Sequence, residues 1–425
     1  MKKRALMFLL GVFALSVFAC NMPTQTPTLI SLTEGPSLTQ NLTLTSIFPP
    51  PSSSPTQTLT STSTPQPPSP TPTQTLAPTL GPLSPVEGYI ILTNTIPGDP
   101  YYEAALMLSE YRSAEIITFI ESPGEALDTL RDRDVNYVAF VIPPNTMDED
   151  LAYAVFQMAK NLDSEYDTDF AYGFITGITA EDVKQYVRNV AAYEAGLVEE
   201  VNQSRVVWRT GEGAISGGAG TIADDYTQSA VELLNEMGLG ATRVDSEQFS
   251  PKELLVEISP ADVLWFNLHA SPIYFETQRG NGLLGTDILE LERGLFIFHT
   301  GCYAGAVYKW YNQGGAAPAT YSERAQFVEP AESLALNFLR NGTLAYFGHL
   351  CMWGSGNWPV ILLDTLEANR DLTVGEMMVA WYTLPAAPSI VEESAATDII
   401  GMDSNRFSHA AIVLYGDPAL HIIFP

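Results

Sequence analysis

The sequence is short of cysteine, of basic residues and of long apolar segments. Only 3 of its 425 residues are cysteine, too few for the disulfide framework of a small secreted domain. Lysine and arginine together number 20 against 49 acidic residues, which gives a formal charge of −29. Because such a chain repels nucleic acid and anionic lipid, we expect no nucleic-acid partner and no membrane adhesion through charge.

The one long apolar run covers residues 5–18, directly behind three basic residues. It is too short to span a bilayer and has the proportions of a signal-peptide core. It ends in VFAC at residues 17–20, which resembles the lipobox where bacterial lipoproteins are diacylated and then cut before the cysteine. We therefore predict a signal peptide over 1–19, a lipid on Cys20, and anchoring at the extracytoplasmic face of the cell membrane. The alternative is an ordinary secretory signal cleaved after Ala19.

The next segment, residues 20–85, has a composition that does not support folding. Thr, Pro, Ser, Gln and Leu dominate it, and Glu34 is its only charged residue. It lacks the aromatic and branched apolar side chains that offset the entropy of ordering, so we expect a proline-stiffened tether. The same composition is typical of O-glycosylated stalks. Such a stalk holds the folded part of the protein clear of the membrane.

From Val86 onward, short apolar runs alternate with amphipathic stretches. This pattern predicts an α/β fold with a mostly parallel sheet and helices on both faces. We expect an N-terminal α/β subdomain over 86–205 and a second subdomain over 206–425, with no internal repeat beyond the alternation itself. The expected strands cover 89–92, 116–119, 137–142, a segment near 206, 263–268, 295–298 and 343–347, and the expected helices cover 101–111, 123–133, 148–162, 180–198, 225–237 and 331–339.

Two motifs in this region have weak functional interpretations. The glycine-rich run 211–220 lacks the Gly-Lys-Ser/Thr ending of a phosphate-binding loop, so we interpret it as a flexible turn. Asp163, Glu165, Asp167 and Asp169 alternate along a short stretch and offer carboxylates to calcium. Because the glycine and closing glutamate of an EF-hand loop are missing, a solvated acidic loop is the preferred interpretation and calcium the weaker one.

Reactive residues follow three of the expected strands. His269 follows the first, His299 and Cys302 follow the second, and His349 and Cys351 follow the third. In doubly wound folds ligands bind at the carboxyl ends of the strands. A histidine beside a cysteine at that edge suits a thiol nucleophile, because the imidazole removes the thiol proton and later protonates the leaving amine.

Other interpretations of these residues stay open. His269 also suits a buried structural histidine, and Cys302 a small apolar filler. His299 is expected to pack against the sheet and to be a poor base. Cys351 is placed to form a disulfide with Cys302, which would silence the nucleophile. The three histidines and two cysteines also have the side chains that zinc prefers, but no pair has the short spacing of a zinc motif, so we expect no metal.

The order of the sequence blocks resembles the gingipain family, in the caspase–gingipain clan of cysteine peptidases. The resemblance covers nearly all of the chain from Tyr89 onward. It implies a caspase-like, mostly parallel sheet with helices on both faces, preceded by a smaller α/β subdomain. The blocks are YIILT, VNYVAFVIPP, YGFITGITAEDVKQYVRNVAAYE, LWFNLHASP, LFIFHTGCYAG, ESLALNFLRNGTLAYFGHLCMWGS and LYGDPAL.

This resemblance assigns roles to individual residues. It implies that His269 is the catalytic histidine, that Cys302 is the nucleophile, and that the main-chain N–H groups of Ala270 and Cys302 stabilise the oxyanion. Ala270 stands where the family usually has glycine, and its methyl group narrows the space near the substrate carbonyl. The pair Gly173-Phe174 stands where the family tends to have Gly-Arg, a change that we expect to affect packing.

The sequence therefore predicts a surface-anchored cysteine endopeptidase that hydrolyses extracellular polypeptides without a cofactor. Trp353, Gly354 and Trp358, which follow the strand before Cys351, are the expected walls of its specificity pocket. A non-catalytic gingipain-like binding module displayed on the cell surface is the main alternative. A zinc-dependent hydrolase is the third interpretation.

Overall fold

The computed structural model describes residues 84–163, 168–198, 201–209, 219–278, 281–311, 325–350, 358–383 and 412–424. All of these residues fall within one compact unit. The predicted signal peptide, Cys20, the predicted stalk up to residue 83 and the glycine-rich run up to residue 218 lie outside the described residues.

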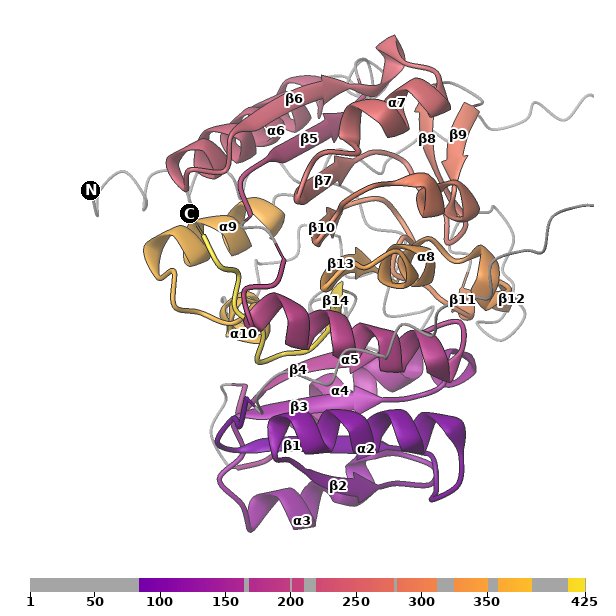
Figure 1. Ribbon diagram of the computed structural model, residues 1–425, viewed down its shortest axis with the longest axis vertical. Coiled ribbons are helices and arrows are strands. Elements are labelled where there is room, and N and C mark those ends of the chain that lie inside the picture. The colour runs from indigo at the N-terminus through magenta and orange to yellow at the C-terminus, as the bar shows by residue number, and fades with distance from the viewer. Residues whose placement is uncertain are drawn as a thin grey trace, which may run out of the picture. The chain divides into compact units, whose positions relative to one another are not determined.

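A ten-stranded sheet forms the centre of the described chain. Its strands are β1 (Tyr89–Thr93), β2 (Glu115–Thr118), β3 (Tyr137–Val141), β4 (Ala171–Ile175), β5 (Ser204–Trp208), β6 (Ala241–Asp245), β7 (Val263–Asn267), β10 (Phe296–His299), β13 (Ala345–His349) and β14 (Ile412–Gly416). Their order across the sheet is β2-β1-β3-β4-β14-β13-β10-β7-β5-β6 (Figure 1). Every neighbouring pair in this sheet is parallel except β13 and β14, which are antiparallel.

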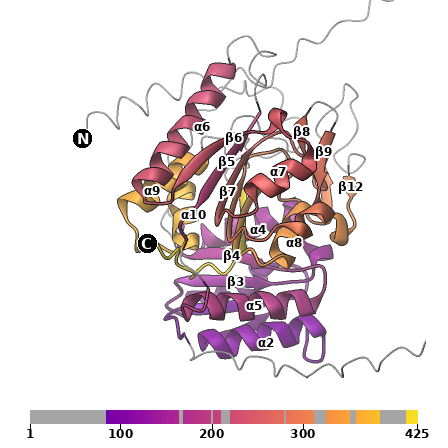
Figure 2. The same cartoon turned by 45° about the horizontal axis from the view of Figure 1, so that its top comes forward.

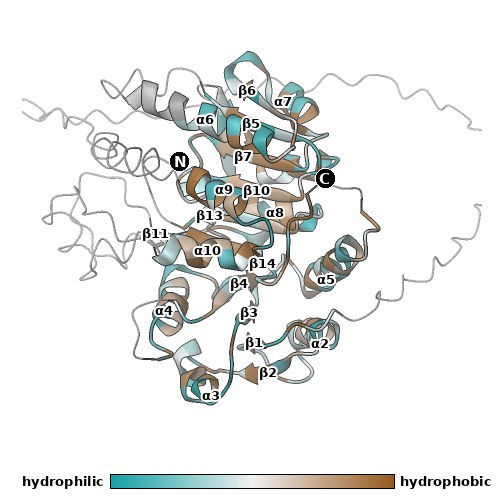
Figure 3. Ribbon diagram, turned by 90° about the vertical axis from the view of Figure 1, so that its left-hand side faces the viewer, coloured by the Kyte–Doolittle hydropathy of each residue, from teal (hydrophilic) through white to brown (hydrophobic). Residues whose placement is uncertain are grey.

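Helices cover both faces of this sheet, as Figure 3 shows with the sheet nearly edge-on and Figure 2 from another side. One face carries α2 (Pro100–Arg112), α5 (Ala180–Glu194), α7 (Pro251–Ile258) and α8 (Leu334–Arg340). The other carries α3 (Leu127–Arg131), α4 (Glu149–Ala159), α6 (Ala219–Glu236), α9 (Trp358–Ala368) and α10 (Val374–Thr383). None of the helices in the described chain combines the length and the apolar character needed to cross a bilayer.

Two small hairpins lie at the same side of the sheet (Figure 1). The first pairs β8 (Tyr274–Gln278) with β9 (Asn281–Leu284), and the second pairs β11 (Lys309–Tyr311) with β12 (Ala325–Phe327). Short 3-10 helices complete the described chain: η1 (Pro123–Ala126), η2 (Pro144–Thr146), η3 (Ser246–Gln248), η4 (Gly285–Glu290) and η6 (Pro330–Glu332).

The predicted fold class is confirmed, and the expected strands match the observed ones within one or two residues. Thr179 caps α5 as its sequence position predicts, because its side chain accepts from the N–H of Asp182. The expected helix over 123–133 is instead η1 followed by α3. Strands β4, β6 and β14 of this sheet were not expected. In β4 a continuous buried run of five residues does not distinguish a strand from a buried helix turn.

The sheet contains a repeat of arrangement that the sequence does not show. In one half the order is β2-β1-β3-β4, and in the other it is β6-β5-β7-β10. In each half the chain first forms the strand next to the edge of the sheet (β1 or β5) and then the edge strand itself (β2 or β6). The next two strands are added on the opposite side of the first strand. Two regions without a shared sequence pattern therefore have the same topology.

The two halves join where β14 lies beside β4. A Cβ on Gly173 would collide with the carbonyl oxygen of Gly416, so glycine allows the two backbones to approach closely there. Phe174 is fully buried beside this contact, with its ring centroid 5.4 Å from that of Phe140 and 6.3 Å from that of Tyr415. The packing role expected for Phe174 agrees with this position.

A buried ion cluster strengthens the same junction. The Arg112 side chain, only 1% exposed, pairs with the fully buried Asp417 and with Glu194. Its Nε donates to the Asp417 carboxylate at 2.8 Å, and the Tyr89 hydroxyl donates to the same carboxylate at 2.9 Å. The cluster ties β1, α2 and α5 to the segment that follows β14.

Candidate active site

The predicted catalytic residues lie at the ends of adjacent strands. Strands β7 and β10 pair in parallel, with Phe266 opposite His299. His269 lies two residues beyond the end of β7, and Cys302 lies three residues beyond the end of β10. The structure therefore brings both residues to the same edge of the sheet, where parallel α/β proteins bind ligands.

Gly301 fixes how closely the two strand ends approach. A Cβ added to Gly301 would lie 2.5 Å from the Ala270 Cβ and 2.6 Å from the Leu268 carbonyl oxygen. Only glycine fits there, so the segment with Cys302 packs directly on the segment with His269. The His269 side chain is exposed and the Cys302 side chain is half-buried, as a base and a nucleophile that meet a substrate at a surface require.

Thr300 anchors the start of the turn that carries Cys302. Its main-chain N–H donates to the Phe266 carbonyl oxygen at 2.9 Å. Its hydroxyl lies 3.1 Å from the same oxygen and 3.0 Å from the Asn267 side-chain oxygen. The turn is therefore bonded to the last residues of the strand that leads to His269.

The residue after Cys302 has an unusual backbone conformation. Tyr303 has φ of 58°, a left-handed value that a bulky side chain rarely adopts and that costs about 1–3 kcal/mol. Its ring lies against that of Trp310 at a tilt of 58°, with centroids 4.4 Å apart, and Cys302 packs against this small cluster. The aromatic contact holds the strained turn that presents the thiol.

Buried hydroxyl groups hold the rest of the turn. The Tyr346 hydroxyl donates to the Ala304 carbonyl oxygen at 2.8 Å, and the Tyr415 hydroxyl donates to that of Gly305 at 2.6 Å. The Gly305 N–H donates to the His349 carbonyl oxygen at 2.7 Å. Because β13 and β14 fix the turn in this way, the position of Cys302 is set before any substrate binds.

The main-chain N–H of Ala270, an expected oxyanion donor, is not bonded across its hairpin. Ala270 and Phe275 form a non-hydrogen-bonded pair of an antiparallel hairpin, so their main chains do not bond each other. The Ala270 N–H therefore points away from Phe275, and within the described residues no recorded acceptor takes it. The Ala270 methyl group, which the family usually lacks, lies against Gly301.

His299 and His349 are core residues. The His299 ring is buried between Phe266 and Phe275, with centroid distances of 5.3 and 5.7 Å. Burial, with a smaller effect of His349, lowers the pKa of His299 to about 3, and burial alone lowers that of His349 to about 3. Both rings are neutral at ordinary pH. His299 packs in the sheet as expected, but His349 is the last residue of β13 and does not lie beyond the strand.

The zinc interpretation does not fit these positions. His299 lies opposite Gly348 in the register, so the next residue, His349, projects to the other face of the sheet. His269 is exposed at the sheet edge, and Cys351 lies outside the described residues. Within the described ranges, no group of three or more His, Cys, Asp or Glu side chains is arranged to hold a metal ion.

The predicted acidic loop is described only in part. Glu165 and Asp167 lie outside the described residues, while Asp163 and Asp169 lie within them. The Asp169 carboxylate accepts the Leu162 N–H at 3.0 Å, and burial raises the pKa of Asp169. The calcium interpretation stays a prediction.

Trp358 is a core residue, which corrects its expected place in a specificity pocket. It begins α9, is 1% exposed, and packs its ring near those of Phe298, Phe347 and His349. A side chain so buried offers no wall to a substrate. Trp353, Gly354 and Cys351 lie outside the described residues.

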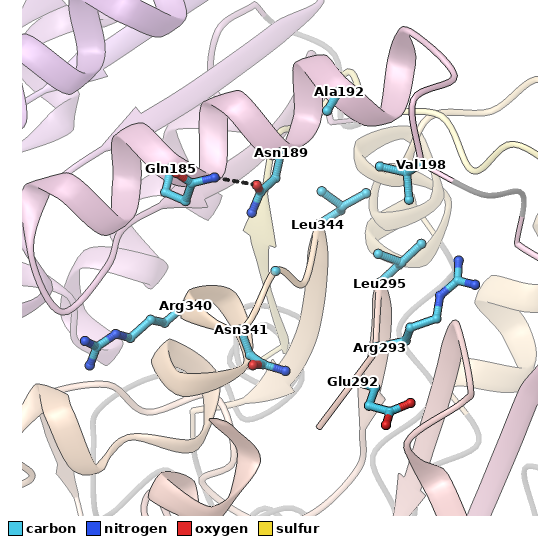
Figure 4. A pocket seen from close by; sticks show the side chains of 12 residues that line it. Gln185, Asn189, Ala192, Val198, Glu292, Arg293, Leu295, Arg340, Asn341 and Leu344 are labelled. Atoms are coloured by element: carbon cyan, nitrogen blue, oxygen red, sulfur yellow. Dashed lines mark hydrogen bonds between the residues drawn. The ribbon is translucent and has the colours of Figure 1, made fainter. Parts of the chain in front are cut away.

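A cavity of about 520 Å³ lies at the opposite edge of the sheet (Figure 4). Its lining includes Leu295, just before β10, and Leu344, just before β13. Gln185 and Asn189 of α5 also line it and are joined by a hydrogen bond of 2.8 Å. Because it opens at the amino ends of the strands, it is separate from the His269 and Cys302 edge.

Comparison with known proteins agrees with this architecture. No protein-family model matches the sequence, and no curated protein matches it either. A crystal structure of the Arg-specific cysteine proteinase gingipain R (RgpB) is similar, with a TM-score of 0.51, 13% identity, and 80% of each chain covered. A complex of the Porphyromonas gingivalis RgpB pro- and mature domains has a TM-score of 0.52 and 13% identity, covering 79% of this chain and 80% of that one.

A third similar structure is described only as a protease. It has a TM-score of 0.50 and 11% identity, with 79% of this chain and 78% of that chain covered. At these identities the likeness concerns the fold. The chain has the mixed α/β architecture of the caspase-like gingipain fold, a large and mostly parallel sheet flanked by helices.

Proposed function

We propose that this protein is a cysteine endopeptidase in which Cys302 is the nucleophile and His269 the general base. The contact of Gly301 with Leu268 and Ala270 carries the proposal, because it packs the thiol-bearing turn on the histidine-bearing segment. The likeness to gingipain R supports a polypeptide substrate.

The proposed reaction uses groups of this chain alone. The Cys302 thiol proton passes to the His269 imidazole, and the thiolate attacks the carbonyl carbon of the scissile peptide bond. The main-chain N–H groups of Ala270 and Cys302 stabilise the oxyanion. The tetrahedral intermediate collapses, the amine leaves with the proton from His269, and a thioester remains. Water, deprotonated by His269, then releases the acid and restores the thiol.

Substitution of the two proposed residues tests this function. Cys302→Ala should abolish peptide hydrolysis and labelling by a thiol-directed peptide probe. His269→Ala should lower kcat/KM by about 10²–10⁴-fold, the usual contribution of a general acid–base group. Cys351→Ala is the matched cysteine control and should retain turnover. It should also protect activity from oxidation if Cys351 forms the predicted disulfide with Cys302.

The binding-module alternative gives the opposite outcome in the same experiment. A folded, reduced wild-type protein would then leave a broad peptide library intact and ignore the probe, while ligand capture would survive Cys302→Ala. That result would overturn the peptidase proposal.

We also propose that the protein is attached to the extracytoplasmic face of the cell membrane through a lipid on Cys20. The VFAC motif and the composition of residues 20–85 support this proposal. Cys20→Ser should release the protein into the medium or leave its signal peptide uncut. Retention in the membrane with an unchanged detergent requirement would contradict the anchor.

A further inference from the structure

The strand that follows the nucleophile turn carries an aromatic side chain beside Cys302. Trp310 is the middle residue of β11, and its ring lies against that of Tyr303, with centroids 4.4 Å apart. Cys302 and Trp310 both pack against the small apolar cluster of Tyr303 and Ala306. Trp310 is only half-buried, so part of its ring is open to a molecule that reaches the thiol.

The register of the β11–β12 hairpin turns Trp310 toward the nucleophile. Trp310 lies opposite Gln326, and the next pair is Lys309 opposite Phe327. Opposed residues of an antiparallel pair share a face and successive residues alternate, so the two pairs lie on opposite faces of the hairpin. The face with Trp310 meets the Cys302 turn, and Gln326 is exposed on it.

Ion pairs hold the other face of the same hairpin. The Lys309 Nζ lies 3.2 Å from Asp148 Oδ2 and 3.6 Å from Asp150 Oδ2. Both carboxylates belong to the start of α4, where Asp148 is the N-cap. The Val328 N–H donates to the Tyr308 carbonyl oxygen at 2.8 Å and closes the base of the hairpin. The hairpin is therefore anchored on both faces, and its position does not depend on a substrate.

The place of α4 in the fold decides on which side of the thiol the hairpin lies. Helix α4 follows β3, and the strand order places β3 and β4 on the opposite side of β10 from β7. The hairpin therefore extends from Cys302 away from His269, which follows β7 (Figure 1). In the proposed reaction His269 protonates the leaving amine, so the leaving part of the substrate lies beside His269. The acyl part then lies on the other side of the thiol, where Trp310 is.

We propose that Trp310 is a specificity-determining residue that contacts a large apolar side chain in the acyl part of the substrate, an inference that rests on the proposed peptidase function. An extended peptide advances about 3.3 Å per residue, so a ring beside the thiol reaches one of the two residues before the scissile bond. The flat indole face buries an apolar side chain that lies on it and offers no countercharge to a charged one. A polypeptide with leucine at that position is therefore preferred to one with alanine.

Peptidyl chloromethyl ketones test this role, because they contain only the acyl part and alkylate the thiol with loss of chloride. The probes carry leucine or alanine at the first or the second residue before the ketone. Wild-type Cys302 should be labelled about 10-fold faster with leucine at one of these positions, the low end of the discrimination that an apolar contact supplies. In Trp310→Ala this preference should fall to within about twofold. Phe327→Ala is the matched control and should keep the preference, because Phe327 is a 63% exposed aromatic residue on the other face of the same hairpin.

The ratio of the leucine and alanine rates separates recognition from a structural role. Trp310 also packs against the strained turn at Tyr303, so its loss should slow labelling by every probe. A purely structural effect slows both probes equally and leaves their ratio unchanged. Trp310→Phe keeps a ring against Tyr303 and should retain an intermediate preference of about threefold, because a smaller ring buries less of the side chain. It provides the same comparison if Trp310→Ala does not fold.

A leucine preference of equal size in wild type, Trp310→Phe and Trp310→Ala would overturn the role of Trp310, and so would a labelled wild type without any preference. Either result leaves the peptidase proposal intact. Labelling that depends on Trp310 in a protein that cleaves no member of a peptide library would keep the acyl-side contact and reject hydrolysis. A folded, reduced wild type that no probe labels and that cleaves no peptide would overturn both.

Discussion

The two halves of the sheet have the same strand order but end in different chemistry. In the first half, Pro143 lies two residues beyond β3 and Ile178 three residues beyond β4. In the second half, His269 and Cys302 occupy the corresponding positions beyond β7 and β10. The topology provides an edge where two strand ends meet, and the residues at that edge decide whether it can carry out a reaction.

The halves also differ in what surrounds the strand ends. The turn after β10 is held by Gly301, Thr300 and two buried tyrosine hydroxyls. In the corresponding segment after β4, the Tyr101 hydroxyl donates to the Gly177 carbonyl oxygen at 3.0 Å, and a Cβ on Gly177 would lie 2.9 Å from the Asp182 Cβ. These contacts come from α2 and α5, so neither joins the segment after β4 to the segment after β3. Among the described residues, only the second half therefore combines reactive side chains at its strand ends with contacts that join those two strand ends.

Breaking the junction between the halves should have the largest effect on stability. Arg112→Ala leaves Asp417 buried without its main cationic partner, so it should lower the free energy of unfolding by about 3–5 kcal/mol. Glu181→Ala, which removes the exposed pair with Arg188, should cost less than about 1 kcal/mol. Urea unfolding of both variants measures the difference, and equal losses would show that the buried cluster does not join the halves.

Acid should destabilise the protein through two buried histidines, His299 on β10 and His349 on β13. An unfolded histidine titrates near pH 6.5, whereas the folded His299 has a pKa of about 3. Between these values the unfolded state binds one extra proton per histidine. The stability that each histidine contributes is therefore complete above about pH 6.5 and falls by about 1.4 kcal/mol per pH unit as the pH drops. His299→Phe should flatten the unfolding free energy against pH by this slope. Phe140→Leu, a core change in the first half that packs against Tyr172 and Phe174, should lower stability equally at every pH.

Gly301 packs against the end of the neighbouring strand, whereas Gly177, its counterpart in the first half, packs against Asp182 of α5. Gly301→Ala would force a Cβ against Ala270 and Leu268, so we expect a loss of about 1–3 kcal/mol and of most peptidase activity. Gly124→Ala, in the first half, meets only the Ser122 hydroxyl oxygen at 3.5 Å and should be neutral or slightly stabilising. Adding Ala270→Gly to the Gly301→Ala chain should restore part of the lost stability and activity. A double variant that is no more stable or active than Gly301→Ala alone would refute the contact.

The smallest expected effect comes from transferring the reactive residues to the first half. Pro143→His with Ile178→Cys, made in the Cys302→Ala chain, should give no labelling by a thiol-directed peptide probe. The transferred pair would share the strand positions but lack a glycine contact between the two strand ends and the bonded turn. Labelling at residue 178, mapped by mass spectrometry, would show that topology alone is sufficient.

The sequence could predict the candidate dyad because its signal is local. His269 and Cys302 each follow an apolar run that can be recognised from adjacent residues. Trp358 was misplaced because an aromatic residue after a strand suits a pocket wall and a core position equally well, and only packing against Phe298 and Phe347 distinguishes them.

The sequence by itself determined the positions of seven of the ten strands in the sheet and of several amphipathic helices, because the periodicity of apolar residues can be read from neighbouring residues. It also placed a histidine and a cysteine just beyond two of those strands. Only the tertiary structure decided the order of the strands, the junction of β4 with β14, and the pairing of Arg112 with Asp417 across 305 positions of the chain. Such contacts depend on how distant segments pack together, and no local pattern in the chain encodes which distant segment will be the partner.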